Sequence, residues 1–349
     1  MATSSSLTLS STTFAKLSPH PFLLANLQPP DPTSTPSART NGRQPRQARP
    51  YSVNTSSLSH AHGSAVVRSG DTTVICGVRG ETLLTSQIPN FRAPQVDADA
   101  DADASNDDEL RDYDLLVPNV ELATGCAPNF LPGVPPTTLA QTLSTRLFSL
   151  LHSSKVLSAE DLRIYYDPTA ASSRGEGDMD EDEDEDEASA MREVKAYWVL
   201  YIDVLFISFD GNPFDVAWAA ILAALRDTKL PRAYWDVDRD MVLCSRPTES
   251  KKPTPLSIRG LPVACTAAVF TAKERQKKGG GKYWILVDPD RLEESLCDET
   301  VTMVVDGTEG EMKILAISKN GGTVVGPALM REFVDVAGVR WKEFRAVLQ

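Results

Sequence analysis

The residues of this chain that could do chemistry are mainly its carboxylates, which are concentrated in two runs. Residues 97–103 alternate Asp and Ala, and residues 180–187 are an unbroken series of Asp and Glu. Asp-x-Asp-x-Asp spacing suggests calcium, but an EF-hand loop also needs a central glycine and a terminal bidentate glutamate, and both are missing. Such runs cannot bury apolar surface, so we expect two disordered acidic insertions, at about residues 97–109 and 173–190. Alternatively, they could dock a basic partner.

Cysteines and histidines give no sign of metal or nucleophilic chemistry. The chain has five cysteines and four histidines, but no C-x-x-C pair, no H-E-x-x-H motif and no local Ser/Cys-His arrangement. We therefore predict no metal site, no cofactor and a reducing compartment. The glycine-rich run at residues 277–282 lacks the G-x-x-x-x-G-K-[ST] spacing of a phosphate loop and leads into a strand, which indicates a hairpin turn.

Net charge is a poor guide to the partners of this chain. Its formal charge is -13, which by itself would disfavour nucleic acid. Seven carboxylates lie in residues 97–109 and nine in residues 178–187, and without these sixteen the rest of the chain would carry +3. Nucleic acid is therefore not excluded. No apolar run approaches the roughly twenty residues of a transmembrane helix, so we expect no membrane partner.

The elements that must position any site include several strands. Two short apolar runs flank the turn Ser69-Gly70-Asp71 at the spacing of a β-hairpin. Residues 115–122 predict a further strand. Residues 196–209 are apolar at nearly every position, which predicts a central strand covered on both faces.

Apolar spacing also predicts helices. Residues 137–151 carry an apolar stripe at Leu139, Leu143 and Leu147. Residues 216–225 read as an alanine-rich buried helix, and a closing helix should reach residue 347. Further short strands are expected at 241–244, 262–270, 282–288, 300–305 and 311–318. This order predicts an α+β fold, with mixed sheets packed against helices.

Residues 1–37 are expected to form a leader. The first thirteen are rich in Ser and Thr and free of acid, like a transit peptide, but they lack arginine, which favours a disordered leader. Residues 14–27 could make a short helix that begins near Ser18-Pro19. Four arginines follow, which we interpret as either an RNA-binding arm or a disordered solubilising linker: Arg39, Arg43, Arg46 and Arg49.

Several motifs resemble the RNase PH family. The hairpin at residues 62–81 carries Gly-Ser-Ala and then Gly-Asp-Thr-Thr-Val, close to the opening hairpin of that family. A proline-rich connector ending at residue 136, a helix followed by Ser154-Lys-Val-Leu, and Asp210-Gly-Asn before an alanine-rich helix are similar to ring subunits of the RNA exosome core. The match is to the group related to the non-catalytic archaeal subunit. The resemblance implies an RNase PH fold (ribosomal protein S5 domain 2-like) over residues 38–349.

The resemblance also implies where active members carry out phosphorolysis. They need a Gly-Thr-Arg at a helix N-terminus to hold phosphate, and paired aspartates for acid catalysis or metal binding. Gly211-Asn212-Pro213-Phe214 stands at the first place, while Asp288 matches the first aspartate and Ser295 the second. We therefore predict a catalytically inert chain. The alternative is an active phosphate-dependent 3'-exoribonuclease.

For an inert member, the resemblance implies a structural role in the exosome ring that supports 3'-to-5' RNA processing and degradation, including rRNA processing and mRNA turnover. The implied partners are other RNase PH-like ring subunits, S1- or KH-type cap subunits, a hydrolytic exoribonuclease and single-stranded RNA. The implied locations are the nucleus, with the nucleolus, and the cytoplasm. An RNA-independent adaptor whose acidic loops dock basic partners is a further alternative.

The expected RNA contacts lie on or just after the first hairpin. They are Arg68, Arg79 and Arg92, because single-stranded RNA is held largely through its phosphates. The alternative for each of them is an ordinary solvated arginine.

Overall fold

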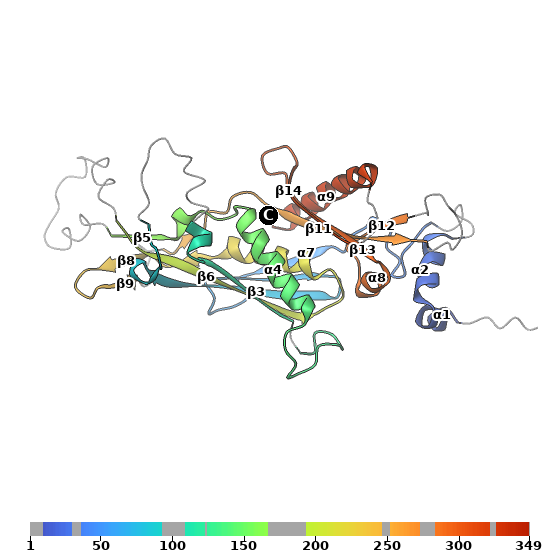
Figure 1. Ribbon diagram of the computed structural model, residues 1–349, viewed down its shortest axis with the longest axis horizontal. Coiled ribbons are helices and arrows are strands. Elements are labelled where there is room, and N and C mark those ends of the chain that lie inside the picture. Colours follow the sequence, from blue (N-terminus) through green and yellow to red (C-terminus); the bar gives the residue numbers. More distant parts are fainter. Residues whose placement is uncertain are drawn as a thin grey trace, which may run out of the picture.

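The computed structural model is elongated and contains two main sheets with helices between and beside them (Figure 1). It describes residues 10–29, 36–92, 109–122, 124–166, 193–245, 252–272, 283–321 and 326–348. Most of both expected acidic insertions, and the glycine-rich run at residues 277–282, lie outside the described residues.

The first sheet has the strand order β1-β2-β3-β6-β4, with β5 also paired to β6. The predicted hairpin is confirmed, since β2 and β3 pair antiparallel on either side of Gly70 and Asp71. Gly70 has a φ of 60°, a conformation that glycine adopts without strain. The strands are β1 (Tyr51–Thr55), β2 (Gly63–Ser69), β3 (Thr72–Leu84), β4 (Leu116–Leu122), β5 (Arg163–Tyr166) and β6 (Glu193–Ser208).

The long strand β6 is central in this sheet, as predicted, because it lies between β3 and β4. Residues 196–200 are buried on both faces of the sheet. From Tyr201 onward burial alternates, and Asp203, Leu205 and Ile207 are exposed. The prediction of two covered faces is therefore wrong for this half of the strand, because no described element packs against its second face.

Helix α4 (Thr138–Ser153) packs against β4. The Thr137 side chain caps the helix by accepting the N–H of Ala140 at 3.3 Å. Leu143 and Leu147 are buried as predicted, but Leu139 is 38% exposed. The buried stripe begins at Ala140 instead, one residue later than the apolar spacing indicated.

Helix α7 (Pro213–Asp227) lies between the two sheets. Every residue from Pro213 to Leu225 is buried, and the helix contacts β2 and β3 on one side and β11 on the other. Its alanines have short side chains, which lets both sheets approach closely. The Trp218 Nε1–H donates to the Pro262 carbonyl at 2.7 Å, so the helix is also hydrogen-bonded to the start of β11.

The second sheet has the order β12-β11-β13-β14. Helix α9 packs on β11, β13 and β1, and it confirms the predicted closing helix. The α+β fold class is also confirmed. The elements here are β11 (Val263–Thr271), β12 (Tyr283–Val287), α8 (Arg291–Leu296), β13 (Glu299–Asp306), β14 (Lys313–Asn320) and α9 (Pro327–Leu348).

Short elements complete the described fold. Strand β7 pairs with β10, and β8 pairs with β9. No helix in the described part of the chain has the length and apolar character needed to cross a membrane. The short elements are η1 (Thr85–Gln87), η2 (Ala159–Leu162), β7 (Lys229–Leu230), β8 (Ala233–Asp236), β9 (Met241–Cys244) and β10 (Thr254–Pro255).

The leader forms two short helices where one was predicted, α1 (Ser11–Leu17) and α2 (Pro19–Leu27). Ser18 separates the two helices and has a φ of −141°, because the proline that follows it disfavours the helical conformation at Ser18. Leu23 and Leu27 of α2 form a small apolar cluster with Phe270 of β11 and Leu286 of β12. The second half of the leader is therefore packed onto the second sheet, at the right-hand end of Figure 1.

The predicted boundary of the first acidic insertion is wrong at Glu109. This residue is 9% exposed. Its carboxylate accepts hydrogen bonds from Arg163 at 2.8 and 3.1 Å and from the Tyr197 hydroxyl at 3.3 Å. Composition cannot separate this last acid from its neighbours, because its partners lie 54 and 88 residues away.

Candidate functional site

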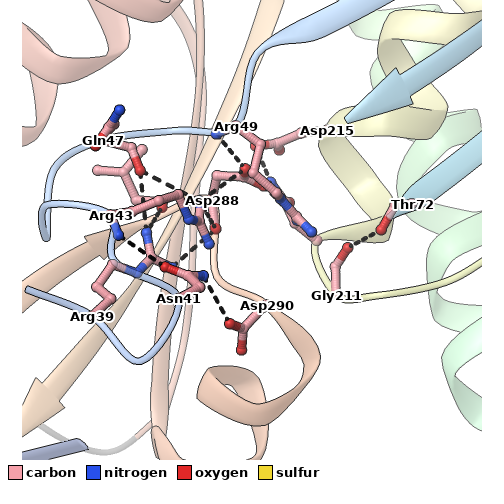
Figure 2. A network of polar contacts seen from close by, with 12 residues as sticks. Arg39, Asn41, Arg43, Gln47, Arg49, Thr72, Gly211, Asp215, Asp288 and Asp290 are labelled. Carbon is pink, nitrogen blue, oxygen red and sulfur yellow. Dashed lines mark hydrogen bonds and ion pairs between the residues drawn. The ribbon is translucent and has the colours of Figure 1, made fainter. Parts of the chain in front are cut away.

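The candidate site surrounds Asp288, which directly follows β12. Asp288 is 1% exposed and has a φ of 51°. Three parts of the chain meet there: the segment before β1, the residues that open α7, and the turn from β12 into α8. Figure 2 shows Arg39, Arg43 and Arg49 of the first of these segments converging on Asp288.

Arg49 holds the Asp288 carboxylate at both oxygens. Its Nε donates to Oδ2 at 2.7 Å and its Nη2 to Oδ1 at 2.8 Å, while its backbone N–H donates to Oδ2 at 2.9 Å. The Asn212 side chain adds a hydrogen bond to Oδ1 at 2.8 Å. Burial alone would raise the pKa of Asp288, but the hydrogen bonds and charge of Arg49 outweigh it and lower the pKa to about 2. Asp288 is therefore ionised, and both of its carboxylate oxygens accept hydrogen bonds from groups of the chain.

Arg39 forms a second buried ion pair. Its Nε donates to Glu293 Oε1 at 2.7 Å, its Nη2 contacts Oε2, and both side chains are fully buried. Its Nη1 also donates to the Val287 carbonyl at 2.6 Å. Glu293 in turn completes a capping box at the start of α8 with Asp290. Arg39 thus joins the segment before β1 to the turn that carries Asp288.

Arg43 lies between these two pairs. Its Nη1 donates to the Asp288 carbonyl at 3.1 Å and lies 3.4 Å from Oδ2 of the same residue. Burial and then the charge of Arg39 lower the pKa of Arg43 to about 10, despite the attraction of Asp288. Its Nε and Nη2 are buried without hydrogen-bond partners.

Both interpretations of the four arginines after the leader are therefore wrong for three of them. Arg39 and Arg49 are 2% and 6% exposed, and Arg43 is largely covered. They are neither an accessible RNA-binding arm nor a solubilising linker. Only Arg46 is exposed, and it pairs with Glu332 of α9 at 2.6 Å. The burial of Arg39 and Arg49 could not be predicted from local sequence, because the carboxylates that hold them lie 254 and 239 residues away.

Gly211-Asn212-Pro213-Phe214, the expected remnant of a phosphate site, does lie beside Asp288. Gly211 and Asn212 have φ values of 80° and 49°, and a Cβ at Gly211 would lie 2.5 Å from the Asp290 carbonyl carbon. Pro213 begins α7. The Phe214 ring lies 4.1 Å below the Arg146 guanidinium carbon and so faces away from solvent. The turn is therefore tightly packed against the start of α8.

A carboxylate of this chain accepts a hydrogen bond from the backbone N–H of that turn. The Asn212 N–H donates to Glu294 Oε1 at 2.7 Å. Burial raises the pKa of Glu294 to about 7, and the neighbouring charges of Asp288 and Asp290 add to this effect. A carboxylate oxygen therefore lies where an anion could approach the N-terminal end of α7.

Ser295 does not take part in this arrangement. It is exposed, and its hydroxyl donates to the Leu292 carbonyl of its own helix at 2.6 Å. The acid adjacent to Ser295, Glu294, is the one that contacts Asn212. The signal in the sequence that could have found Glu294 is its position directly before Ser295.

Asp215 is a further buried acid that the sequence reasoning missed. Its carboxylate accepts the Thr266 N–H and hydroxyl, both at 2.7 Å, and the Asn212 side chain at 2.9 Å. Burial raises its pKa, partly offset by these hydrogen bonds. No group of three or more His, Cys, Asp or Glu residues in the described segments is arranged to hold a metal ion. The carboxylates of Asp215 and Asp288 are thus both hydrogen-bonded to groups of the chain itself.

The three arginines expected to contact RNA are not brought together as one patch. The backbone of Arg68 pairs with that of Thr73 on β3. Thr73 lies six residues before Arg79 on the same strand, so the backbones of Arg68 and Arg79 are about 20 Å apart. Arg68 lies 3.6 Å from Asp71. Arg79 pairs with Glu81 at 2.9 Å, and its guanidinium lies over the Tyr201 ring. All three side chains are exposed, Arg92 included.

Comparison with known proteins places the chain in a family. Residues 47–231 match domain 1 of the 3' exoribonuclease family, and residues 260–339 match its domain 2. The chain belongs to this family. The predicted resemblance to RNase PH proteins is therefore confirmed.

Relatives within the 3' exoribonuclease family carry exosome names. Exosome complex component rrp43 of Schizosaccharomyces pombe is 29% identical, and exosome complex component Rrp42 of Archaeoglobus fulgidus is 25% identical, each over 86% of both chains. A chain of the Archaeoglobus fulgidus exosome with RNA bound to the active site is 22% identical, with a TM-score of 0.60 over 95% of this chain and 97% of that one. A chain of an archaeal exosome core gives 0.54 at 23% identity, over 88% and 91%. These structures share the fold.

We predict that Arg49→Lys lowers the free energy of unfolding by about 2–4 kcal/mol, because an ammonium cannot hold both oxygens of a buried carboxylate. Urea unfolding at neutral pH measures this. Arg46→Lys is the matched control, since its pair with Glu332 is exposed and such pairs contribute at most about 1 kcal/mol. Equal stabilities of the two variants would contradict a structural role for the Arg49–Asp288 pair.

A second prediction concerns pH. Glu294 has a raised pKa in the folded chain, about 7 against 4.5, so its contribution to stability is complete below about pH 4.5 and is lost as the pH rises through 7. The free energy of unfolding of the wild type should fall, relative to Glu294→Gln, by no more than about 3 kcal/mol between pH 5 and 8.

Urea unfolding across this pH range measures the difference. Glu121→Gln, which changes an exposed acid on β4, should leave the pH profile unchanged. Parallel profiles for the wild type and Glu294→Gln would show that Glu294 ionises normally.

Proposed function

We propose that this chain is a non-catalytic structural subunit of the exosome core ring. In this role it supports 3'-to-5' RNA processing and degradation, including rRNA processing and mRNA turnover, by guiding single-stranded RNA to a partner nuclease. Membership of the 3' exoribonuclease family and the exosome names of its relatives support the ring role. The contact between Glu294 and Asn212 carries the proposal that the subunit is inert.

The charges at the site argue against a phosphate substrate. Arg39 and Arg49 are held by Glu293 and Asp288, and the two nitrogens of Arg43 that form no hydrogen bond are buried. The guanidinium groups of Arg39 and Arg49 are therefore not free to balance a phosphate dianion at the N-terminal end of α7. An incoming phosphate would have to displace Glu294 and would lie among carboxylates: Asp210, Asp215, Asp288, Asp290 and Glu293.

The proposed partners are other RNase PH-like ring subunits, S1- or KH-type cap subunits, a hydrolytic exoribonuclease and single-stranded RNA. The open face of β6 supports a contact with a neighbouring subunit, since Leu205 is 37% and Ile207 49% exposed there. We further propose that the chain works in the nucleus, including the nucleolus, and in the cytoplasm.

Affinity purification of the tagged chain from nuclear and cytoplasmic fractions of its own cells, followed by mass spectrometry, tests the assembly. We expect both fractions to contain other RNase PH-like chains together with S1- or KH-type proteins and a hydrolytic nuclease. Recovery of a homo-oligomer alone would contradict the ring role and favour a phosphorolytic enzyme.

The purified full-length chain, incubated with single-stranded RNA and inorganic phosphate, tests inertness directly. No nucleoside diphosphate should be released, while an active bacterial RNase PH serves as the positive control. Phosphate-dependent shortening of the RNA by this chain would overturn the proposal and leave the fold assignment intact.

The RNA path through the ring can be tested at Arg79 and Arg92. Their joint replacement by Gln in the assembled ring should weaken RNA binding about threefold or more, and the loss should shrink at high salt. Crosslinking of labelled single-stranded RNA measures this. Arg239→Gln, in the turn between β8 and β9, is the control. Unchanged crosslinking in the double variant would remove both arginines from the path.

A further inference from the structure

A groove unrelated to the Asp288 site lies between the end of α7, residues 256–261 and the last turns of α9. Its volume is about 460 Å³, within the roughly 300–1,000 Å³ that is usual for ligand sites. The C-terminal end of α9 that borders it lies near the middle of the long molecule, at the mark C in Figure 1.

Two arginines border the groove without an ion-pair partner in the described part of the chain. They are Arg226, near the end of α7, and Arg345, near the end of α9, and both are exposed. Arg345 stacks over the ring of Trp341, with 5.2 Å from its guanidinium carbon to the ring centre. This contact orients Arg345 without neutralising it.

Two acids near groove residues in the chain accept hydrogen bonds from other groups, and one of them, Asp306, is bonded to Leu261 and Thr308 of the groove lining. Asp227 accepts the Ser56 N–H at 3.0 Å and its hydroxyl at 2.6 Å, and also the Ser64 N–H at 3.0 Å. Asp306 accepts the Leu261 N–H at 3.0 Å and the Thr308 N–H at 2.9 Å. Neither carboxylate forms an ion pair with Arg226 or Arg345 in the described segments, so a carboxylate from outside could pair with these arginines.

The floor of the groove is aliphatic. Leu256 and Leu261 are 8% and 4% exposed, and Ile258 is half-buried. Trp341 is only 5% exposed, and its Nε1–H donates to the Leu261 carbonyl at 2.9 Å. The indole ring is therefore covered and offers no free face on which a base could stack. Since binding of single-stranded RNA commonly uses such stacking, the groove favours a peptide over RNA.

We propose that this groove binds a short acidic peptide segment of a partner protein. Carboxylates of the segment pair with Arg226 and Arg345, and an aliphatic side chain between them packs on Leu256 and Ile258. This site goes beyond the proposed ring role, because it does not require ring assembly.

Fluorescence anisotropy with a labelled Asp-Glu-Leu-Asp-Glu peptide and the purified full-length chain tests the proposal. The double variant Arg226→Gln/Arg345→Gln should weaken binding about five- to tenfold, because two ion pairs are lost. Arg239→Gln/Arg331→Gln removes the same charge from exposed positions outside the groove and should change binding less than twofold. Raising the salt concentration should weaken wild-type binding.

Two further arms keep the result interpretable. Arg226→Gln alone leaves the stack on Trp341 intact and should still weaken binding, which separates a lost ion pair from disturbed packing. An Asp-Glu-Ser-Asp-Glu peptide should bind more weakly than the leucine peptide, because it has no aliphatic side chain for the floor.

Several results would overturn the proposal. These are an absence of peptide binding, equal loss in the groove and control variants, or equal binding of the serine and leucine peptides. Displacement of the peptide by oligouridylate, with the same dependence on Arg226, would assign the groove to RNA. A rise in peptide affinity after deletion of residues 173–190 would identify the chain's own acidic segment as the occupant.

Discussion

The buried ion pair between Arg49 and Asp288 joins parts of the chain that are far apart in sequence. Arg49 precedes β1, Asp288 follows β12, and Asn212, which donates to the same carboxylate, precedes α7. Removing two charges from water costs several kcal/mol each, and only good geometry with further hydrogen bonds offsets this. Here both oxygens of Asp288 are met by Arg49, and the backbone N–H of Arg49 adds a third contact. The relative placement of the two sheets at this point depends on that geometry.

Burial raises the pKa of both neighbouring acids at the site, Asp288 and Glu294, but their net pKa shifts are opposite. Asp288 is held ionised because a guanidinium lies against it, whereas Glu294 has only an N–H donor and a more distant arginine, so burial makes protonation easier. Under the proposed function, this contrast has a simple basis. The groups that could have held a substrate anion instead hold carboxylates of the chain itself, and the site contributes to the stability of the fold.

Apolar spacing was enough to predict most of the fold. The hairpin at Gly70, the helix capped by Thr137 and the strands of the second sheet were all predicted, because each depends on residues close in sequence. The open face of β6 was not predicted, because the apolar pattern of a strand does not show whether another element covers both of its faces. The candidate site was located by Asp288 and the turn at Asn212, but the burial of Arg39 and Arg49 depends on acids more than two hundred residues away. Local patterns carry no information about such pairs.

The position of α7 has a consequence for how this protein unfolds. The helix falls within the first family domain, yet it packs against β11 of the second and donates a hydrogen bond to Pro262 from Trp218. A fragment that ended at residue 231 would expose one side of a helix that is buried on all sides in the whole chain. The two matched domains therefore share one core, and they should melt together in a single cooperative transition rather than as two separable units.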